Sequence, residues 1–193
     1  MRYILASKSP RRKELMNKIS SDFLVVTEDI DEESSYKLSP IEAVKDIARR
    51  KGEAVYSSYP NDIVISADTI VVIDNKIIGK PIDEKDAYRI LKLLSGRTHY
   101  VLTGYAIHYL DKVIVNYVKT DVTFNELSDE LIYSYIKSGS PMDKAGAYGA
   151  QDSDRQYPII KNIVGSYDNV IGFPTQEIKD DINKLLRLSS SNN

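Results

Sequence analysis

The sequence contains no cysteine, no tryptophan and only two histidines among its 193 residues. Without cysteine the chain can form no disulfide, no thiolate metal site and no cysteine nucleophile, which fits a cytoplasmic protein. His99 and His108 are too few for a three-histidine zinc site. No apolar run approaches the ~20 residues that span a bilayer, and the run from Tyr3 to Ala6 is too short for a signal-peptide core. We therefore expect no membrane association.

The sequence also lacks an excess of one charge. Its 26 basic and 28 acidic residues give a net charge of −2, and 42% of the residues are hydrophobic. This composition is typical of a soluble globular protein, and the length suffices for one sizeable core or two close lobes. The balance of charge argues against general nucleic-acid binding, so any polyanion site has to be local.

Periodicity and capping residues place the main elements. Ser39, Pro40 and Glu42 predict a capping box at the start of a helix. Strands are expected at 1–6, 23–26, 62–74, 76–78, 100–110, 113–124 and 157–164, and helices at 10–18, 40–56, 83–94, 128–138 and 175–187. The elements mix without strict strand–helix alternation and no long linker divides them. We expect one α/β domain at 1–188, built as a mixed sheet with helices around it, and a disordered tail at 189–193.

The first helix begins with an unusual concentration of positive charge. In LASKSPRRKEL (Leu5 to Leu15), Ser9 is the expected N-cap and Pro10 the first helical residue. The free N–H groups of a helix start are already electropositive, so cations there cost some ~0.3–1 kcal/mol each. Arg11 and Arg12 suit a bound phosphate at this position. An exposed basic turn explains the same residues equally well.

Two charged residues interrupt apolar patterns. Asp68 falls within the β-branched run IVISADTIVVI, which indicates a site at that strand more than a surface turn, because apolar residues flank it on both sides. Lys51 lies on the apolar face of the helix at 40–56, where a lysine at the rim of the core is the commoner explanation.

Other polar residues complete a set that suits phosphate chemistry. They are Asp31 and Glu32 in the acidic loop EDIDEE, Lys80 in a Gly-Lys-Pro turn, and Asp143, Lys144 and Gln151 in or beside the glycine-rich stretch GSPMDKAGAYG. Such glycine-rich stretches are mostly connectors, but they also let backbone approach a phosphate or a base. Cations suit a polyphosphate, and carboxylates suit Mg²⁺ or Mn²⁺. No P-loop, dinucleotide-binding fingerprint or serine-hydrolase elbow is present.

A series of motifs resembles the Maf family of nucleoside triphosphate pyrophosphatases. The motifs are LASKSPRR (Leu5 to Arg12), SADT (Ser66 to Thr69), GKPIDEKDAYRILKLLSGRTHYVLTG (Gly79 to Gly104), SGSPMDKAGAYGAQ (Ser138 to Gln151) and GSYDNVIGFP (Gly165 to Pro174). They follow the family order over nearly the whole chain. The resemblance implies an elongated mixed sheet with flanking helices and two lobes around a cleft, similar to inosine triphosphate pyrophosphatase. It also implies a homodimer.

The activity implied is hydrolysis of a nucleoside triphosphate to the monophosphate and pyrophosphate with a divalent metal, Mg²⁺ or Mn²⁺. The residues at the discriminating positions resemble the branch that prefers dTTP and UTP, with modified pyrimidine triphosphates as further substrates in a house-cleaning role. The alternatives are a pyrophosphatase for 7-methyl-GTP or non-standard purine triphosphates, and a regulator of septum formation in cell division.

The resemblance also assigns roles to single residues. Asp68 matches the family's proton acceptor, and Asp68 and Glu32 are the expected metal ligands. Three positions match those tied to substrate choice: Arg11, Thr69 and Gln151. The expected phosphate contacts are Ser7, Arg11, Arg12, Lys51 and Lys80.

The chain departs from the family motifs at a few positions. Ser140 stands where glutamate is usual, and Asp152 stands where glycine usually follows the glutamine. Phe173 and Thr175 replace leucines around Pro174. None of these changes removes an expected catalytic residue, and Asp152 is expected to affect the fine substrate preference.

Overall fold

A computed structural model describes residues 1–190 of the chain. In this range a seven-stranded sheet has the strand order β2-β1-β3-β5-β6-β7, with β4 paired to β3. The strands are β1 (Tyr3–Leu5), β2 (Phe23–Val25), β3 (Ile63–Ile73), β4 (Lys76–Ile78), β5 (Thr98–Tyr109), β6 (Lys112–Phe124) and β7 (Ile160–Val164). β1 pairs in parallel with β2 and β3, whereas β4 and β7 pair antiparallel with β3 and β6. The predicted mixed sheet is confirmed.

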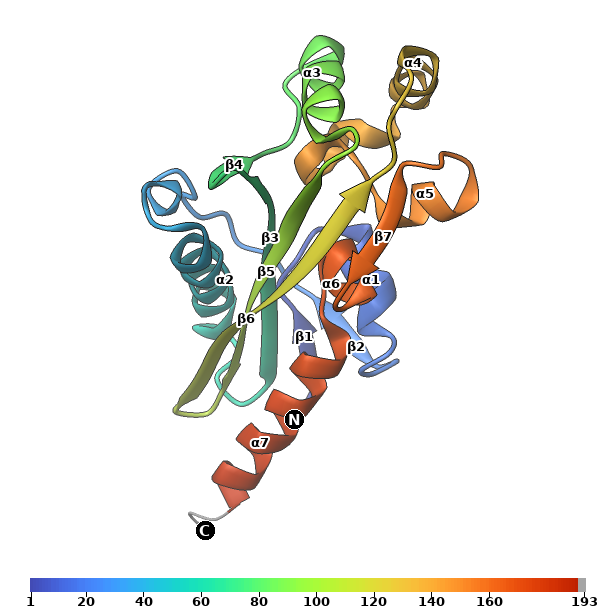
Figure 1. The fold of residues 1–193 in the computed structure, drawn as a ribbon. Helices are drawn as coiled ribbons and strands as arrows, with labels where there is room; N and C mark the ends of the chain where they lie inside the picture. The colour runs from blue at the N-terminus through green and yellow to red at the C-terminus, as the bar shows by residue number, and fades with distance from the viewer. Residues whose placement is uncertain (191–193) are drawn as a thin grey trace. The chain divides into compact units, whose positions relative to one another are not determined.

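Helices flank this sheet (Figure 1). They are α1 (Pro10–Met16), α2 (Pro40–Tyr56), α3 (Glu84–Leu94), α4 (Asp129–Lys137), α5 (Ala150–Arg155), α6 (Tyr167–Ile171) and α7 (Thr175–Ser190), with 3-10 turns η1 (Ser35–Lys37), η2 (Ser140–Asp143) and η3 (Ala145–Ala147). The chain divides into a first unit of Met1–Asp68, Thr103–Val118 and Gly172–Asn193, and a second unit of Thr69–Leu102 and Lys119–Ile171.

Capping residues set the helix boundaries as the sequence predicts. Ser9 accepts a hydrogen bond from the Arg12 N–H at the start of α1, and the Ser39–Glu42 capping box begins α2. Asp74 and Asn75 both have positive φ in the tight turn between β3 and β4. The sequence predicts these caps and this turn because the residues that form them lie within a few positions of one another along the chain.

The helices differ from the predicted ones in three places. The sequence predicts no helix at 165–174, which contains α6, and none directly after the glycine-rich stretch, where α5 begins. Both helices are short, with five and six residues, so neither leaves the apolar periodicity by which a helix is recognised. The last helix reaches Ser190 rather than 187, so Ser189 and Ser190 of the expected disordered tail are helical. Residues 191–193 of that tail lie outside the described residues.

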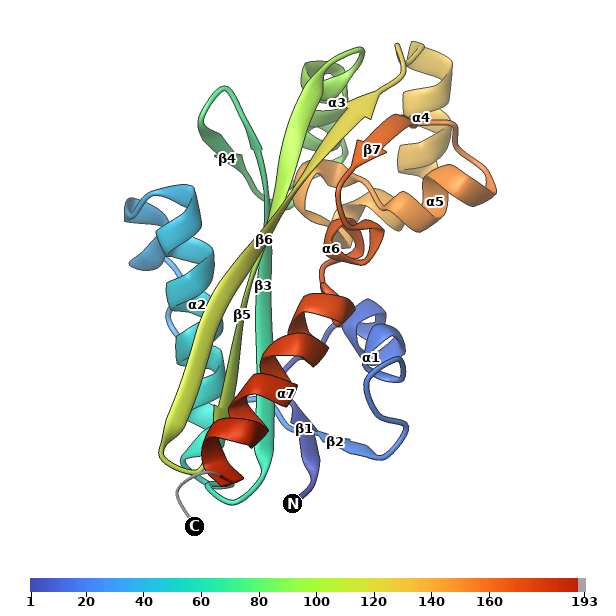
Figure 2. The same cartoon turned by 60° about the horizontal axis from the view of Figure 1, so that its bottom comes forward.

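In the first unit, α2 and α7 cover opposite faces of the strands (Figure 2). The Ser66 hydroxyl of β3 donates to the Ala48 carbonyl of α2 at 2.6 Å. A Cβ at Gly104 of β5 would lie 2.3 Å from the Val44 carbonyl oxygen, so only glycine permits this close packing of α2. The next residue, Tyr105, faces the other way, and its hydroxyl donates to Asp181 of α7 at 2.7 Å.

The second unit has its own core. α3, α4, η2 and η3 pack on β3, β5 and β6 around buried side chains such as Leu91, Phe124 and Tyr135. His99 is 2% exposed, and its ring meets those of Phe124 and Tyr148 edge to face. Its Nε2 lies 2.7 Å from the Tyr148 hydroxyl. Burial lowers the pKa of His99 to about 4.

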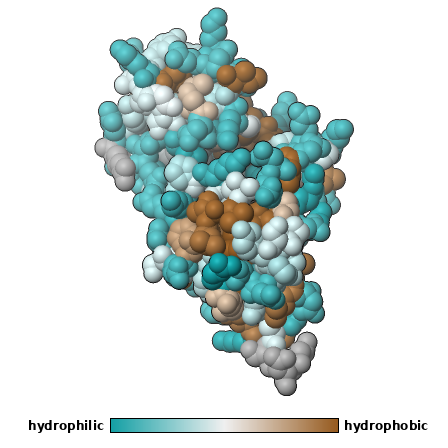
Figure 3. Space-filling model, turned by 180° about the vertical axis from the view of Figure 1, so that it is seen from behind, coloured by the Kyte–Doolittle hydropathy of each residue, from teal (hydrophilic) through white to brown (hydrophobic). Residues whose placement is uncertain are grey.

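The surface is mostly hydrophilic on the face shown in Figure 3. Among the described residues, no helix combines the length and the apolar character that crossing a bilayer requires.

We predict that His99 makes the folded state sensitive to acid. Its pKa is about 4 when folded and ~6.5 when unfolded. The unfolded chain therefore binds a proton that the folded chain does not, and stability falls as the pH drops from 6.5 to 4, by up to about 3 kcal/mol. Urea unfolding of His99→Gln against the wild type across this range should show a shallower loss in the variant. If the free energy of unfolding fell equally with pH in the wild type and in His99→Gln, His99 would not be the source of the acid sensitivity.

Candidate active site

The start of α1 holds two of the expected phosphate contacts, Ser7 and Arg12, in direct contact. Arg12 Nη1 donates to the Ser7 hydroxyl at 3.3 Å, and Arg12 Nε donates to the Gly172 carbonyl at 2.8 Å. The Ser9 N–H also donates to the Ser7 hydroxyl, at 3.3 Å. The guanidinium is therefore held between the strand–helix turn and the residue that precedes Phe173. Arg11 is half-buried beside it on α1.

The environment of Arg12 shows how charge is distributed at this end of the helix. Burial lowers the pKa of the Arg12 guanidinium, the Asp68 and Glu32 carboxylates oppose this effect, and Arg11 adds to it. The first turn of α1 contains no acidic residue. Asp68 on β3 and Glu32 in the acidic loop are thus the carboxylates that compensate the charge of the half-buried arginine.

Lys51 connects those two carboxylates. Its Nζ lies 2.8 Å from Glu32 Oε1 and 2.9 Å from Asp68 Oδ1, and 21% of its side chain is exposed. Lys51 extends from the same face of α2 as the fully buried Ile47. Lys51 therefore lies at the edge of the core, as the commoner explanation from the sequence has it, and its ammonium group pairs with two carboxylates there.

Asp68 lies inside an uninterrupted strand. β3 continues through Asp68 and Thr69 to Ile73, so the surface turn considered from the sequence is absent at this position. Asp68 Oδ1 accepts a hydrogen bond from Lys51, whereas Asp68 Oδ2 is buried without a hydrogen-bond partner. A buried acceptor without a partner costs about 1–3 kcal/mol. This oxygen is where a proton or a cation would be stabilised.

Contacts between the acidic loop and α2 hold Glu32 in place. Ser35, 1% exposed, donates to Asp46 at 2.7 Å and accepts from Arg50 at 3.1 Å. The Tyr36 hydroxyl approaches Glu32 Oε2 at 3.5 Å, and burial together with the Asp68 and Glu32 charges raises the pKa of Tyr36. Sequence reasoning missed Tyr36, since a tyrosine in a polar loop of a chain with 14 tyrosines carries no distinguishing signal.

The donor set fits a divalent cation that also binds phosphate oxygens. Among residues 1–190, no cluster of three or more His, Cys, Asp or Glu side chains is arranged to hold a metal. Mg²⁺ is usually held by one or two carboxylates, water and substrate phosphates rather than by a cage of protein ligands. Asp68, through its Oδ2, and Glu32 match that requirement.

The remaining expected site residues belong to the second unit. Thr69 follows Asp68 on β3, exposed Lys80 follows β4, and half-buried Gln151 lies in the first turn of α5.

The Gly146 N–H donates to the Gly79 carbonyl at 3.0 Å, which brings the Lys80 turn against the glycine-rich stretch. Gly146 has φ +72° and lies so close to Val71 that a Cβ would come within 2.7 Å of its Cγ2. The stretch is therefore packed on β3.

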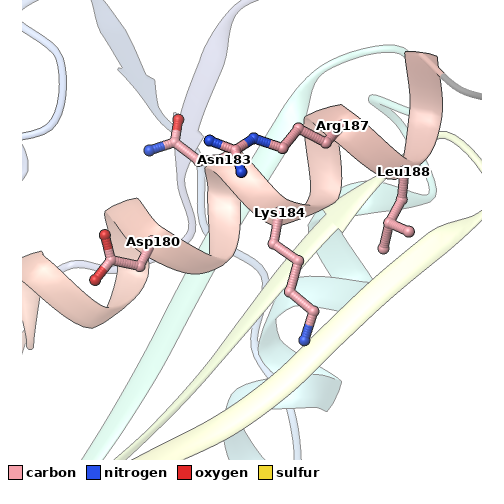
Figure 4. A pocket seen from close by; sticks show the side chains of 5 residues that line it. All are labelled: Asp180, Asn183, Lys184, Arg187 and Leu188. Carbon is pink, nitrogen blue, oxygen red and sulfur yellow. The ribbon is translucent and has the colours of Figure 1, made fainter.

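A separate cavity lies on the outer side of α7 and includes none of these residues. Its volume is about 460 Å³, and Asp180, Asn183, Lys184, Arg187 and Leu188 line it (Figure 4). All five belong to one helix. The candidate site is therefore assigned from the charged groups around Lys51 and not from the shape of this hollow.

We predict that removing Lys51 destabilises the fold. Lys51→Met leaves the buried Asp68 carboxylate without its cation, so the free energy of unfolding should fall by about 2–3 kcal/mol. Adding Asp68→Asn to that variant should restore most of the loss, as measured by urea unfolding. Lys8→Met is the matched control, because the Lys8–Asp29 pair is exposed (71% and 93%) and should contribute little. Equal losses in both single variants would contradict the prediction.

Comparison with known proteins places this arrangement in context. The dTTP/UTP pyrophosphatase of Thermococcus gammatolerans is 48% identical over 175 residues, which covers 91% of this chain and 92% of that protein. The dTTP/UTP pyrophosphatase of Dictyoglomus thermophilum is 45% identical over 185 residues, covering 94% and 95%.

The fold and the family are supported separately. The structure of a HAM1 protein from Coxiella burnetii matches with a TM-score of 0.51 over 97% of this chain and 98% of that one; at 13% identity this likeness shows the fold alone. The family model described as Maf-like protein matches residues 2–185. The chain therefore belongs to the Maf-like family.

Proposed function

We propose that the protein hydrolyses dTTP and UTP to the nucleoside monophosphate and pyrophosphate. Family membership and the dTTP/UTP pyrophosphatases that match nearly the whole chain support this activity. The observation that carries it is the carboxylate of Asp68, which is held by Lys51 on one oxygen and has a buried, unpartnered second oxygen. Such a group suits the acid–base chemistry of phosphoanhydride hydrolysis.

In this proposal Asp68 is the catalytic residue. It accepts the proton of a water molecule whose oxygen attacks the α-phosphorus. The bond between the α-phosphorus and the oxygen that bridges to the β-phosphate breaks, and pyrophosphate leaves with that electron pair. Lys51, which Glu32 also binds, fixes the Asp68 carboxylate. Positioning and charge stabilisation supply most of the rate enhancement.

The cations of the first unit neutralise the phosphates. Lys51 uses two of its three N–H donors on Glu32 and Asp68, so the third remains for a phosphate oxygen. Arg12 is held by Ser7 and Gly172 beside the start of α1, where N–H groups favour an anion. Ser7 and Arg11 are proposed to add phosphate contacts there, and Arg11 also takes part in substrate choice.

Roles in the second unit rest on the motifs. Lys80 is proposed as a further phosphate contact, and Thr69 and Gln151 as residues that select the base. Threonine and glutamine carry both hydrogen-bond donors and acceptors, as recognition of a pyrimidine edge requires. A pyrimidine preference would follow from these contacts.

Asp68 and Glu32 are also proposed to hold the divalent cation. When bound, Mg²⁺ or Mn²⁺ supplies positive charge to the phosphate oxygens. The proposed homodimer rests on the family resemblance, and the proposed cytoplasmic location rests on the lack of cysteine.

Incubation with a panel of nucleoside triphosphates tests the reaction. With Mg²⁺ or Mn²⁺, dTTP and UTP should give monophosphate and pyrophosphate faster than 7-methyl-GTP or ITP does, and EDTA should abolish turnover. Release of orthophosphate from the triphosphate would refute the bond assignment. Faster hydrolysis of the purine nucleotides would assign the protein to the alternative substrate class.

A pair of aspartate variants tests the proton acceptor. Asp68→Asn should lower kcat for UTP by 10²–10⁴-fold, as expected for loss of a general base. Asp62→Asn is the matched control, since Asp62 lies beside the start of β3, is 10% exposed like Asp68, and pairs with Arg2 at 2.8 Å. That variant should lose stability but keep kcat within about threefold of the wild type. Full activity in Asp68→Asn would sink the role proposed for Asp68.

A further inference from the structure

One carboxylate oxygen in the second unit gathers donors from two other segments. Asp152 on α5 accepts a hydrogen bond on Oδ2 from the Tyr135 hydroxyl of α4 at 2.6 Å. The same oxygen accepts from the Ser140 hydroxyl of η2 at 2.8 Å. Lys144 Nζ lies 3.7 Å from it. Asp152 therefore ties the end of α4 and the glycine-rich stretch to the first turn of α5.

The partners of Asp152 are themselves tied together. Lys144 Nζ donates to the Ser140 hydroxyl at 3.0 Å and to the Ser140 carbonyl. The Tyr135 hydroxyl accepts from the Gly149 N–H at 3.1 Å, and Tyr135 is fully buried. Burial and the hydrogen bond to Asp152 raise the pKa of Tyr135, so its hydroxyl stays protonated and remains a donor. The network thus has fixed donor and acceptor roles.

The network determines how α5 begins. A Cβ at Gly149 would lie 2.8 Å from Lys144 Cε and 3.0 Å from Asp152 Oδ2, so the chain runs tightly past both side chains. α5 has six residues and no side-chain hydrogen bond at its N-cap. A helix this short has little stability of its own and depends on tertiary contacts. Gln151 lies in its first turn, next to Asp152.

We propose that Asp152 is a positioning residue that sets the orientation of Gln151, and through it the choice of nucleotide base. This inference rests on the proposed function, in which Gln151 contacts the base. Asp152 does not touch the substrate; it acts by fixing the backbone of residues 149–152 through Tyr135, Ser140 and Lys144. The two departures from the family motifs, Ser140 and Asp152, are therefore hydrogen-bonded to each other. At these two positions the family has one carboxylate, on the usual glutamate at 140, and this chain also has one, on Asp152.

Kinetics of Asp152 variants test the inference. Asp152→Ala should raise KM for UTP and dTTP about tenfold, leave kcat within about twofold, and reduce discrimination against CTP. Asp152→Asn keeps the shape and one acceptor oxygen, so it should fall between Asp152→Ala and the wild type. Asp154→Asn is the control, because Asp154 lies on the same helix and bonds a different tyrosine, Tyr167. Unchanged KM and base discrimination in Asp152→Ala would overturn the proposal, as would an equal effect in Asp154→Asn.

A variant that moves the carboxylate from position 152 to position 140 tests whether the function of Asp152 can be restored. In the variant Ser140→Glu with Asp152→Gly, a longer side chain carries the carboxylate toward Tyr135 and Lys144 from the other side of the network. This double variant should recover the KM and discrimination that Asp152→Gly alone loses. If it behaves like Asp152→Gly, the carboxylate is not what positions Gln151.

The side-chain amide signal of Gln151 separates this inference from the proposed reaction. Its ¹⁵N–¹H resonances, assigned by their loss in Gln151→Ala, should shift or broaden in Asp152→Ala but not in Asp154→Asn. If the signal moves while the wild type hydrolyses no pyrimidine triphosphate, the proposed function fails and the positioning role remains. If the signal does not move, the positioning role fails whatever the activity.

Discussion

The ammonium group of Lys51, placed between Asp68 and Glu32, is the interaction on which the first unit depends. Asp68 lies on a strand whose neighbouring residues are almost fully buried, and a carboxylate is rarely tolerated there without a partner. Lys51 supplies that partner and also fixes the acidic loop through Glu32. Lys51 binds only one of the two Asp68 oxygens, and the other oxygen is buried without a hydrogen-bond donor. The unpartnered oxygen lowers the stability of the fold, and it provides an acceptor for a charged ligand.

The arginines at the start of α1 belong to the same balance of charge. A helix N-terminus disfavours nearby cations, yet Arg12 is half-buried there and donates hydrogen bonds to Ser7 and Gly172. Its compensation comes from Asp68 and Glu32, which lie far away in the sequence. The helix, the acidic loop and β3 are therefore coupled electrostatically, and a phosphate would change the balance for all three together.

Much of the fold could be predicted because its signals are local. The caps at Ser9 and Ser39, the Asp74–Asn75 turn and the β-branched run of β3 each specify structure within a few residues. The partners of Lys51 could not be derived, because helical periodicity shows which face a side chain lies on but not which group meets it. α5 and α6 were missed since tertiary contacts, and not apolar periodicity, stabilise them. Among the expected site residues of the first unit, Glu32 and Asp68 contact Lys51, and Ser7 contacts Arg12. Thr69, Lys80 and Gln151 belong to the second unit.

The continuity of β3 has a consequence for how the protein tolerates change. Asp68 and Thr69 are joined by one peptide bond and point to opposite faces of the same strand. A slip of one residue in strand pairing would exchange the proposed proton acceptor with a residue proposed for base choice. An insertion or deletion of one residue in β3 would have the same effect, because it too reverses the faces of all residues that follow it. Substitutions at Asp68 or Thr69 keep this register, whereas a change of length in β3 does not.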